Sequence, residues 1–184
     1  MILIYVLIAI AILIVLWGVS VFNGLVRRKN MVAEGWSGID TQLKRRADLI
    51  PNMVETVKGY ATHEQTTFDE LAKARSQGQS QDPTQRAAQE TAITAAIGKV
   101  MAVAEAYPQL RASENFQTLQ KDLADIEDQI QLARRYYNGT VRDFNTTIQQ
   151  FPSNIVAGFG GFTAAPFFQI ENEADRAVPK VSFN

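Results

Sequence analysis

The chain has 184 residues, of which 18 are Lys or Arg, 19 are Asp or Glu and none is Cys. Such a nearly neutral charge balance argues against a surface built to bind nucleic acid. The lack of Cys excludes disulfides and lipid attachment through cysteine. About 160 residues follow an apolar N-terminal segment, which is enough for one globular domain with its own core.

The apolar segment covers residues 2–22 and carries no charge. As an α-helix that rises about 1.5 Å per residue, it spans roughly 31 Å, close to the thickness of the hydrocarbon core of a bilayer. No basic residue precedes it, and the residues after it form a poor cleavage site, so a membrane helix fits better than a cleaved signal peptide. We therefore predict a single transmembrane anchor over residues 1–24.

Basic residues follow the apolar segment closely, whereas only the α-amino group precedes it. Because positive charge is retained on the cytoplasmic side, this asymmetry predicts a protein of the cytoplasmic (inner) membrane with its N-terminus outside and its C-terminal domain in the cytoplasm. Each basic residue near anionic headgroups contributes about 1 kcal/mol, and an aromatic ring near the basic end anchors the helix at the interface. The residues expected to contact the membrane surface are Trp17, Arg27, Arg28 and Lys29.

A helical domain is predicted over residues 25–151. Apolar residues at steps of three and four predict a first helix over about residues 30–75. Pro51 lies inside this range, but the apolar spacing continues in phase across it. This continuity favours a kink within one helix over two helices joined by a loop.

Two further helices are predicted from capping signals and apolar spacing. After a polar loop at residues 76–80, Asp82 as the N-cap and Pro83 in the first turn begin a second helix, which ends near Tyr107. The third helix begins near Ser113 and ends before Pro152.

The third helix carries apolar residues at seven-residue intervals, which predicts left-handed supercoiling against partner helices. The residues of this stripe are Phe116, Leu123, Ile130, Tyr137, Phe144 and Phe151. The fold class is therefore all-α: one transmembrane helix followed by an elongated antiparallel bundle of three helices, or of four if Pro51 divides the first.

The C-terminal tail, residues 152–184, is rich in Gly, Pro and Phe and has no helical period. Disordered segments are poor in aromatic residues, so we expect this irregular tail to dock. Its own bundle, the membrane interface and a neighbouring protein all remain open as docking places. The candidate self-association residues are Phe159, Phe162, Phe167, Phe168 and Phe183.

No catalytic, cofactor-binding or metal-binding residues are predicted. His63 is the only histidine, and one histidine without cysteine does not build a usual zinc site. Glu64 falls near an apolar position, for which an exposed helix face is favoured over a buried polar layer formed with His63. The basic run at residues 44–46 is interpreted as solvated rather than as a binding site for lipid or for an acidic partner.

Three stretches of sequence together resemble the LemA family of bacterial membrane proteins. They are WSGIDTQLKRRADLIPNMVETVKGYATHE at residues 36–64, EAYPQLRASENFQTLQ at 105–120, and ARRYYNGTVRDFN at 133–145, which runs on to FPSN at 151–154. The resemblance implies an N-terminal membrane helix, a helical bundle facing the cytoplasm or the envelope, and no established enzyme activity. It also implies work beside envelope proteins or membrane proteases.

Two functional hypotheses follow. The first is a non-enzymatic scaffold of the LemA type that self-associates at the bacterial cytoplasmic membrane. The second is a monomeric adaptor or sensor that presents clients to a membrane protease or another envelope enzyme. The expected partners are membrane lipids, further copies of the chain and an envelope protein or membrane protease, with no nucleic acid and no cofactor.

Overall fold

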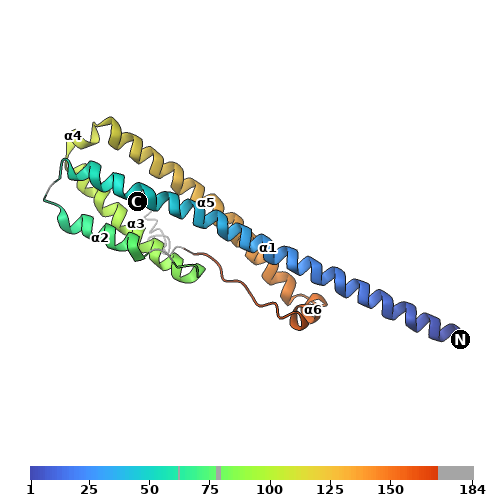
Figure 1. Ribbon diagram of the computed structural model, residues 1–184. Helices are drawn as coiled ribbons and strands as arrows, with labels where there is room; N and C mark the ends of the chain where they lie inside the picture. Colours follow the sequence, from blue (N-terminus) through green and yellow to red (C-terminus); the bar gives the residue numbers. More distant parts are fainter. Residues whose placement is uncertain (62, 78–79, 170–184) are drawn as a thin grey trace, which may run out of the picture. The chain divides into compact units, whose positions relative to one another are not determined.

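The computed structural model describes residues 1–61, 63–77 and 80–169, and every regular element among them is a helix (Figure 1). The all-α prediction is confirmed. In chain order the helices are α1 Ile2–Lys58, α2 Gln65–Gln77, α3 Pro83–Glu105, α4 Pro108–Arg111, α5 Glu114–Gln149 and α6 Ser153–Phe159.

The chain forms two compact units. Of the described residues, unit 1 consists of 1–38 and 133–167, and unit 2 consists of those in 39–132 together with Phe168 and Gln169. Helices α1 and α5 contribute residues to both units, whereas α2, α3 and α4 belong to unit 2 and α6 belongs to unit 1.

Helix α1 contains both the apolar N-terminal segment and the first helix of the predicted domain. Pro51 lies inside it, as predicted, with its ring exposed. Because proline has no backbone N–H, the carbonyl four residues earlier receives no hydrogen bond from the helix backbone at this position. That carbonyl belongs to Ala47, and Arg75 Nε of α2 donates to it over 3.0 Å. A side chain from the next helix thus replaces the backbone donor that proline lacks.

The predicted end of the first helix, near residue 75, is wrong. Helix α1 ends at Lys58, and α2 begins only at Gln65. Gly59 follows α1 directly, and a glycine disfavours continuation of a helix because it loses the most conformational freedom there. The break therefore lies at the glycine and not at the proline.

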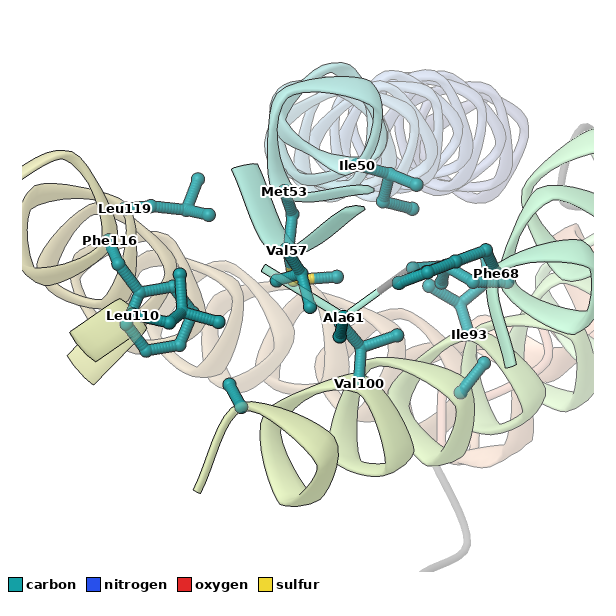
Figure 2. Packing of buried hydrophobic residues seen from close by; sticks show 13 residues of the cluster. Ile50, Met53, Val57, Ala61, Phe68, Ile93, Val100, Leu110, Phe116 and Leu119 are labelled. Carbon is teal, nitrogen blue, oxygen red and sulfur yellow. The ribbon is translucent and has the colours of Figure 1, made fainter. Parts of the chain in front are cut away.

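The core of unit 2 is an apolar cluster to which α1, α2, α3, α4 and α5 all contribute (Figure 2). Its largest fully buried members include Met53 from α1, Phe68 from α2 and Phe116 from α5.

The two predicted helix caps are confirmed. Asp82 accepts hydrogen bonds from the backbone of Thr84 and Gln85, and Ser113 Oγ accepts one from the backbone of Phe116. Helix α3 ends slightly earlier than predicted, and α4 follows it.

The seven-residue stripe of α5 is buried for most of its length. Phe116, Ile130, Tyr137 and Phe144 are buried, and Leu123 is partly buried against the core of unit 2. Phe151 departs from the prediction, because α5 ends at Gln149 and this ring is 80% exposed.

Unit 1 has a smaller core, formed by Leu25 of α1, Phe144 of α5 and Ala157 of α6. The prediction of a tail without helix is therefore wrong over Ser153–Phe159. Beyond α6, Gly160 and Gly161 turn the chain. A Cβ at Gly160 would lie 2.6 Å from the ring of Phe162, and Gly161 has a φ of +66°.

The described part of the tail docks on its own chain. Asn145 of α5 exchanges two hydrogen bonds with the backbone of Ala165, at 2.9 and 2.8 Å. The hydroxyl of Tyr137 donates to the carbonyl of Pro166 over 2.8 Å. The sequence left three docking places open: the chain's own bundle, the membrane interface and a neighbouring protein. For residues up to 166, these contacts show docking on the chain's own helices.

Candidate functional site

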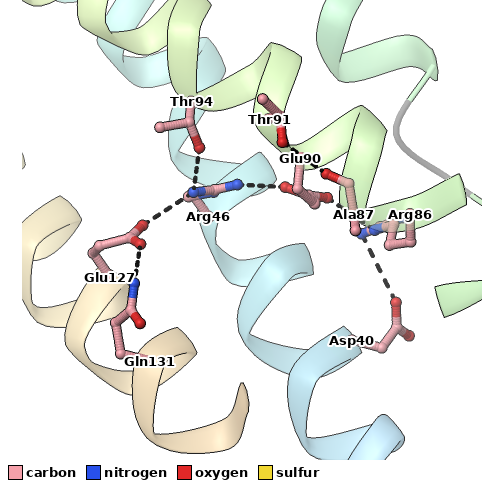
Figure 3. Close-up of polar contacts among 9 residues, drawn as sticks. All are labelled: Asp40, Arg46, Arg86, Ala87, Glu90, Thr91, Thr94, Glu127 and Gln131. Carbon is pink, nitrogen blue, oxygen red and sulfur yellow. Dashed lines mark hydrogen bonds and ion pairs between the residues drawn. The ribbon is translucent and has the colours of Figure 1, made fainter. Parts of the chain in front are cut away.

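The most heavily charged part of the interior lies in unit 2, around Arg46 of α1. Its side chain is only 3% exposed, and its guanidinium contacts three groups on two other helices (Figure 3). Glu90 of α3 forms a buried ion pair with it, Thr94 of α3 accepts a hydrogen bond at 3.1 Å, and Glu127 of α5 accepts one at 3.0 Å. Arg46 therefore joins α1 to both α3 and α5.

Glu90 is the shared acceptor of this network. It is 1% exposed, and its second oxygen lies 2.8 Å from Arg86 Nε on the preceding turn of α3. Arg86 also faces Asp40 of α1 at 3.8 Å, and Asp40 in turn pairs with Lys44 at 2.6 Å. Removing one charge from such a buried set leaves the other charges uncompensated, so its members depend on one another.

A groove of about 460 Å³ lies beside the network in unit 2. Both acidic and basic side chains line it: Asp40, Lys44, Asp48, Arg75 and Arg86. Several of these groups already have partners within the chain, since Asp40 binds Lys44 and Arg75 binds the carbonyl of Ala47. The groove thus offers a polar surface of mixed sign and no single ligand chemistry. Among the described residues no group of three His, Cys, Asp or Glu side chains could hold a metal ion.

Sequence reasoning missed this network. The run at residues 44–46 was interpreted as solvated, which fits the exposed Lys44 and Arg45, but Arg46 is buried. A signal was present, because Arg46 lies three residues after Leu43 and four before Ile50, in phase with the apolar face of the helix. An arginine at such a position requires buried carboxylate partners.

The region of His63 and Glu64 contains no buried polar layer. Helix α1 has already ended there, His63 is exposed, and Glu64 accepts backbone hydrogen bonds from the first turn of α2. The sequence analysis favoured an exposed helix face here over a buried polar layer. The absence of such a layer agrees with that preference, but the helix that was expected to continue through these two residues ends before them.

Comparison with known proteins identifies the family. The model of the LemA family matches residues 35–183. The chain belongs to the LemA family.

Individual relatives match over shorter lengths. Protein LemA of Metamycoplasma hominis is 28% identical over 137 residues, which cover 73% of this chain and 63% of that protein. Magnetosome protein MamQ 2 of Paramagnetospirillum magneticum is 31% identical over 83 residues, 45% of this chain and 30% of that protein. Magnetosome protein MamQ of Magnetospirillum gryphiswaldense is 26% identical over the same length. The chain thus spans less than two thirds of each of these relatives.

The membrane-facing residues predicted for this LemA-family chain all lie on α1. Within the described residues, α1 is the helix that is long and apolar enough to cross a membrane, and none of its most apolar stretch is buried. Trp17 and the basic residues Arg27, Arg28 and Lys29 are exposed. Their contact with the membrane surface stays a prediction.

The five phenylalanines proposed for self-association have different environments. Phe168 is fully buried, and Phe162 packs against Phe22 and Phe144 with ring centroids 5.5 and 6.3 Å apart. Phe159 and Phe167 are exposed, and Phe183 lies outside the described residues. Among the four that the structure describes, Phe159 and Phe167 therefore have rings accessible to another molecule.

Proposed function

We propose that this LemA-family chain is a non-enzymatic, single-pass protein of the cytoplasmic membrane that acts as a self-associating structural scaffold. The observation that carries the proposal is the nature of α1. One uninterrupted helix contains an exposed apolar segment of spanning length and then supplies Leu25 to the core of unit 1 and Met53 to that of unit 2. Such a helix joins an anchor directly to a folded domain.

The orientation follows from charge. Arg27, Arg28 and Lys29 come directly after the apolar segment, so the folded units lie on the cytoplasmic side. The charges buried in unit 2 are paired with one another, which suits a structural role for that interior rather than a reactive one.

Self-association is supported by a hollow face of α1 near the end of the apolar segment. Ser20 and Gly24 lie four residues apart on this face, with Asn23 beside them. Within the described parts of the chain, nothing outside the local helix comes within 4 Å of a Cβ built on Gly24, so no contact seen there requires a glycine. In membranes, small residues at this spacing let helices approach closely, and Asn forms hydrogen bonds between helices.

The tail contributes less to this interface than its composition suggests. Because Phe162 and Phe168 are already packed within the chain, only Phe159 and Phe167 remain available from the described residues. The hollow face of α1 is therefore the main contact proposed between copies.

The test is the molar mass of the intact chain in a mild detergent, measured by light scattering. We expect an oligomer that Ser20→Leu and Gly24→Leu shift to smaller species without loss of helix content. Gly18→Leu is the matched control, because Gly18 is equally free of internal contacts but lies on the opposite side of α1 from Ser20, at about 100° per residue. A monomer mass for the unaltered chain would reject the scaffold.

That result would favour the second candidate, a monomeric adaptor or sensor that presents clients to a membrane protease or another envelope enzyme. The groove of unit 2 supports this alternative, because its mixed charges suit a polar segment of a client. Crosslinking from a groove position such as Asp48 to a client, in cells where the chain is monomeric, would distinguish the two.

A further inference from the structure

Helix α6 lies at the level where the apolar segment of α1 ends. The last apolar residue before Asn23 is Phe22, and its ring meets that of Phe162 edge to face, with centroids 5.5 Å apart. Less than one helical turn further along α1, Leu25 packs with Ala157 of α6. If α1 spans a bilayer over residues 2–22, α6 therefore lies at the boundary between hydrocarbon and headgroups.

Beyond Ser153 and the exposed Asn154 in its first turn, helix α6 has apolar residues on both of its faces. Ala157 is buried and Val156 packs against the core of unit 1, whereas Ile155 is 49% exposed and Phe159 is 92% exposed. Phe151, in the turn between α5 and α6, is 80% exposed. We call Phe151, Ile155 and Phe159 the elbow face. Exposed apolar side chains that group on one face in this way mark a site of contact with a membrane or with another protein.

The surroundings of the elbow face also lack charge. No charged residue occurs between Asp143 and Glu171, so no ionic side chain on this part of the chain resists transfer into an apolar layer. The nearest charges on α1 are Arg27, Arg28 and Lys29, all exposed and within about one turn beyond Leu25. This order, with apolar rings first and basic residues further from the hydrocarbon, matches that of a bilayer surface with anionic headgroups.

We propose that the elbow face inserts into the interfacial layer of the bilayer that α1 spans, and that its occupant is phospholipid. The inference rests on the proposed spanning position of α1 but not on self-association. Continuity with the apolar segment favours lipid over a second copy, because a bilayer at the level of Phe22 reaches the elbow face without any partner protein. The exposed rings thereby gain an apolar environment that water denies them.

The experiment uses the absence of Cys from the chain, which allows a single nitroxide label at any chosen position. Phe159→Cys and, separately, Ile155→Cys are labelled in the full chain and reconstituted into vesicles of equal parts phosphatidylcholine and phosphatidylglycerol. The collision rates of each label with oxygen, which concentrates in lipid, and with a water-soluble nickel chelate are then compared by electron paramagnetic resonance. Both side chains are exposed, so neither change removes a core contact.

Two control positions distinguish insertion of the elbow face from the spanning position of α1, on which it depends. Leu13→Cys reports the centre of the apolar segment, and Tyr136→Cys reports an exposed aromatic position on α5 that belongs to the same unit and precedes Phe151 by several helical turns. We expect labels at residues 13, 155 and 159 to favour oxygen and the label at residue 136 to favour the nickel chelate.

Each other outcome overturns the inference in a recognisable way. Nickel-chelate access at residues 155 and 159, with lipid access at 13, rejects the elbow contact and leaves the anchor intact. Nickel-chelate access at residue 13 rejects the spanning position of α1 and the elbow contact with it. Protection from both reagents, with dipolar broadening between labels, identifies a second copy as the occupant and also rejects lipid.

Discussion

The two units of this LemA-family chain are stabilised in different ways. Unit 2 encloses a broad aliphatic and aromatic cluster drawn from five helices. It adds a buried ion pair between α1 and α3 and a partly exposed one between α1 and α5. Unit 1 buries fewer apolar side chains, among them Leu25, Tyr137, Val141, Phe144 and Ala157. It also has a set of aromatic edge contacts and a short segment of tail held by hydrogen bonds. Its exposed apolar side chains include those of the elbow face and of the N-terminal half of α1.

This difference has a physical reason. A domain surrounded by water must bury its apolar surface within itself, and it can include charges only when they are paired. A domain against a bilayer can leave apolar side chains exposed, because lipid covers them. Unit 2 follows the first rule, and we interpret the exposed side chains of unit 1 by the second.

The largest effect on stability is expected at Glu90, whose removal tests the contribution of the buried ion pairs to unit 2. Glu90→Ala removes the buried carboxylate that pairs with the guanidinium of Arg46, and Arg86 loses the same carboxylate. We therefore expect a loss of about 3–5 kcal/mol in the free energy of unfolding. Urea unfolding followed by circular dichroism measures it.

Glu127→Ala is the matched control for this change. Glu127 binds the same Arg46, but its side chain is 42% exposed, so we expect a loss of at most about 1 kcal/mol. Equal losses for Glu90 and Glu127 would show that burial does not set the strength of this network.

A smaller effect is expected at Asn145, which holds the tail to unit 1. Asn145→Ala removes both hydrogen bonds to Ala165, and the backbone donor and acceptor left behind lose their partners. We expect a loss of about 1–3 kcal/mol, with faster amide exchange and proteolysis over residues 163–167.

The control is Asn154→Ala in the same unit, at an exposed asparagine, for which a change within about 0.5 kcal/mol is expected. Unchanged amide exchange at residue 165 in the Asn145 variant would mean that the tail is held by its apolar contacts alone.

Much of the fold could be predicted from the sequence because the signals are local. The length and lack of charge of residues 2–22, the cap at Asp82 and the spacing of the apolar residues of α5 each act within a few residues. The family could also be recognised, since long ordered stretches carry the resemblance.

The two main omissions, the burial of Arg46 and the docking of the tail, have a different origin, because each depends on contacts between segments distant in sequence. Arg46 is buried only because Glu90 and Glu127 reach it from other helices, 44 and 81 residues away. The tail was left without a docking place because Asn145 and Tyr137, which hold it, show no sign of that role in their own helix. The spacing of residues along one helix does not show which residues of other helices they will contact.

The smallest predicted effect tests how α1 tolerates Pro51. Arg75→Met keeps most of the apolar stem but removes the hydrogen bond to the carbonyl of Ala47, so we expect a loss of about 0.5–1.5 kcal/mol. In a Pro51→Ala background the restored backbone N–H can bond to that same carbonyl, so the Arg75→Met change should then cost less. The difference between the two losses, measured by urea unfolding as a double-mutant cycle, gives the coupling between the two residues. Independent effects would show that Arg75 stabilises α2 against α1 in general and does not compensate for the proline.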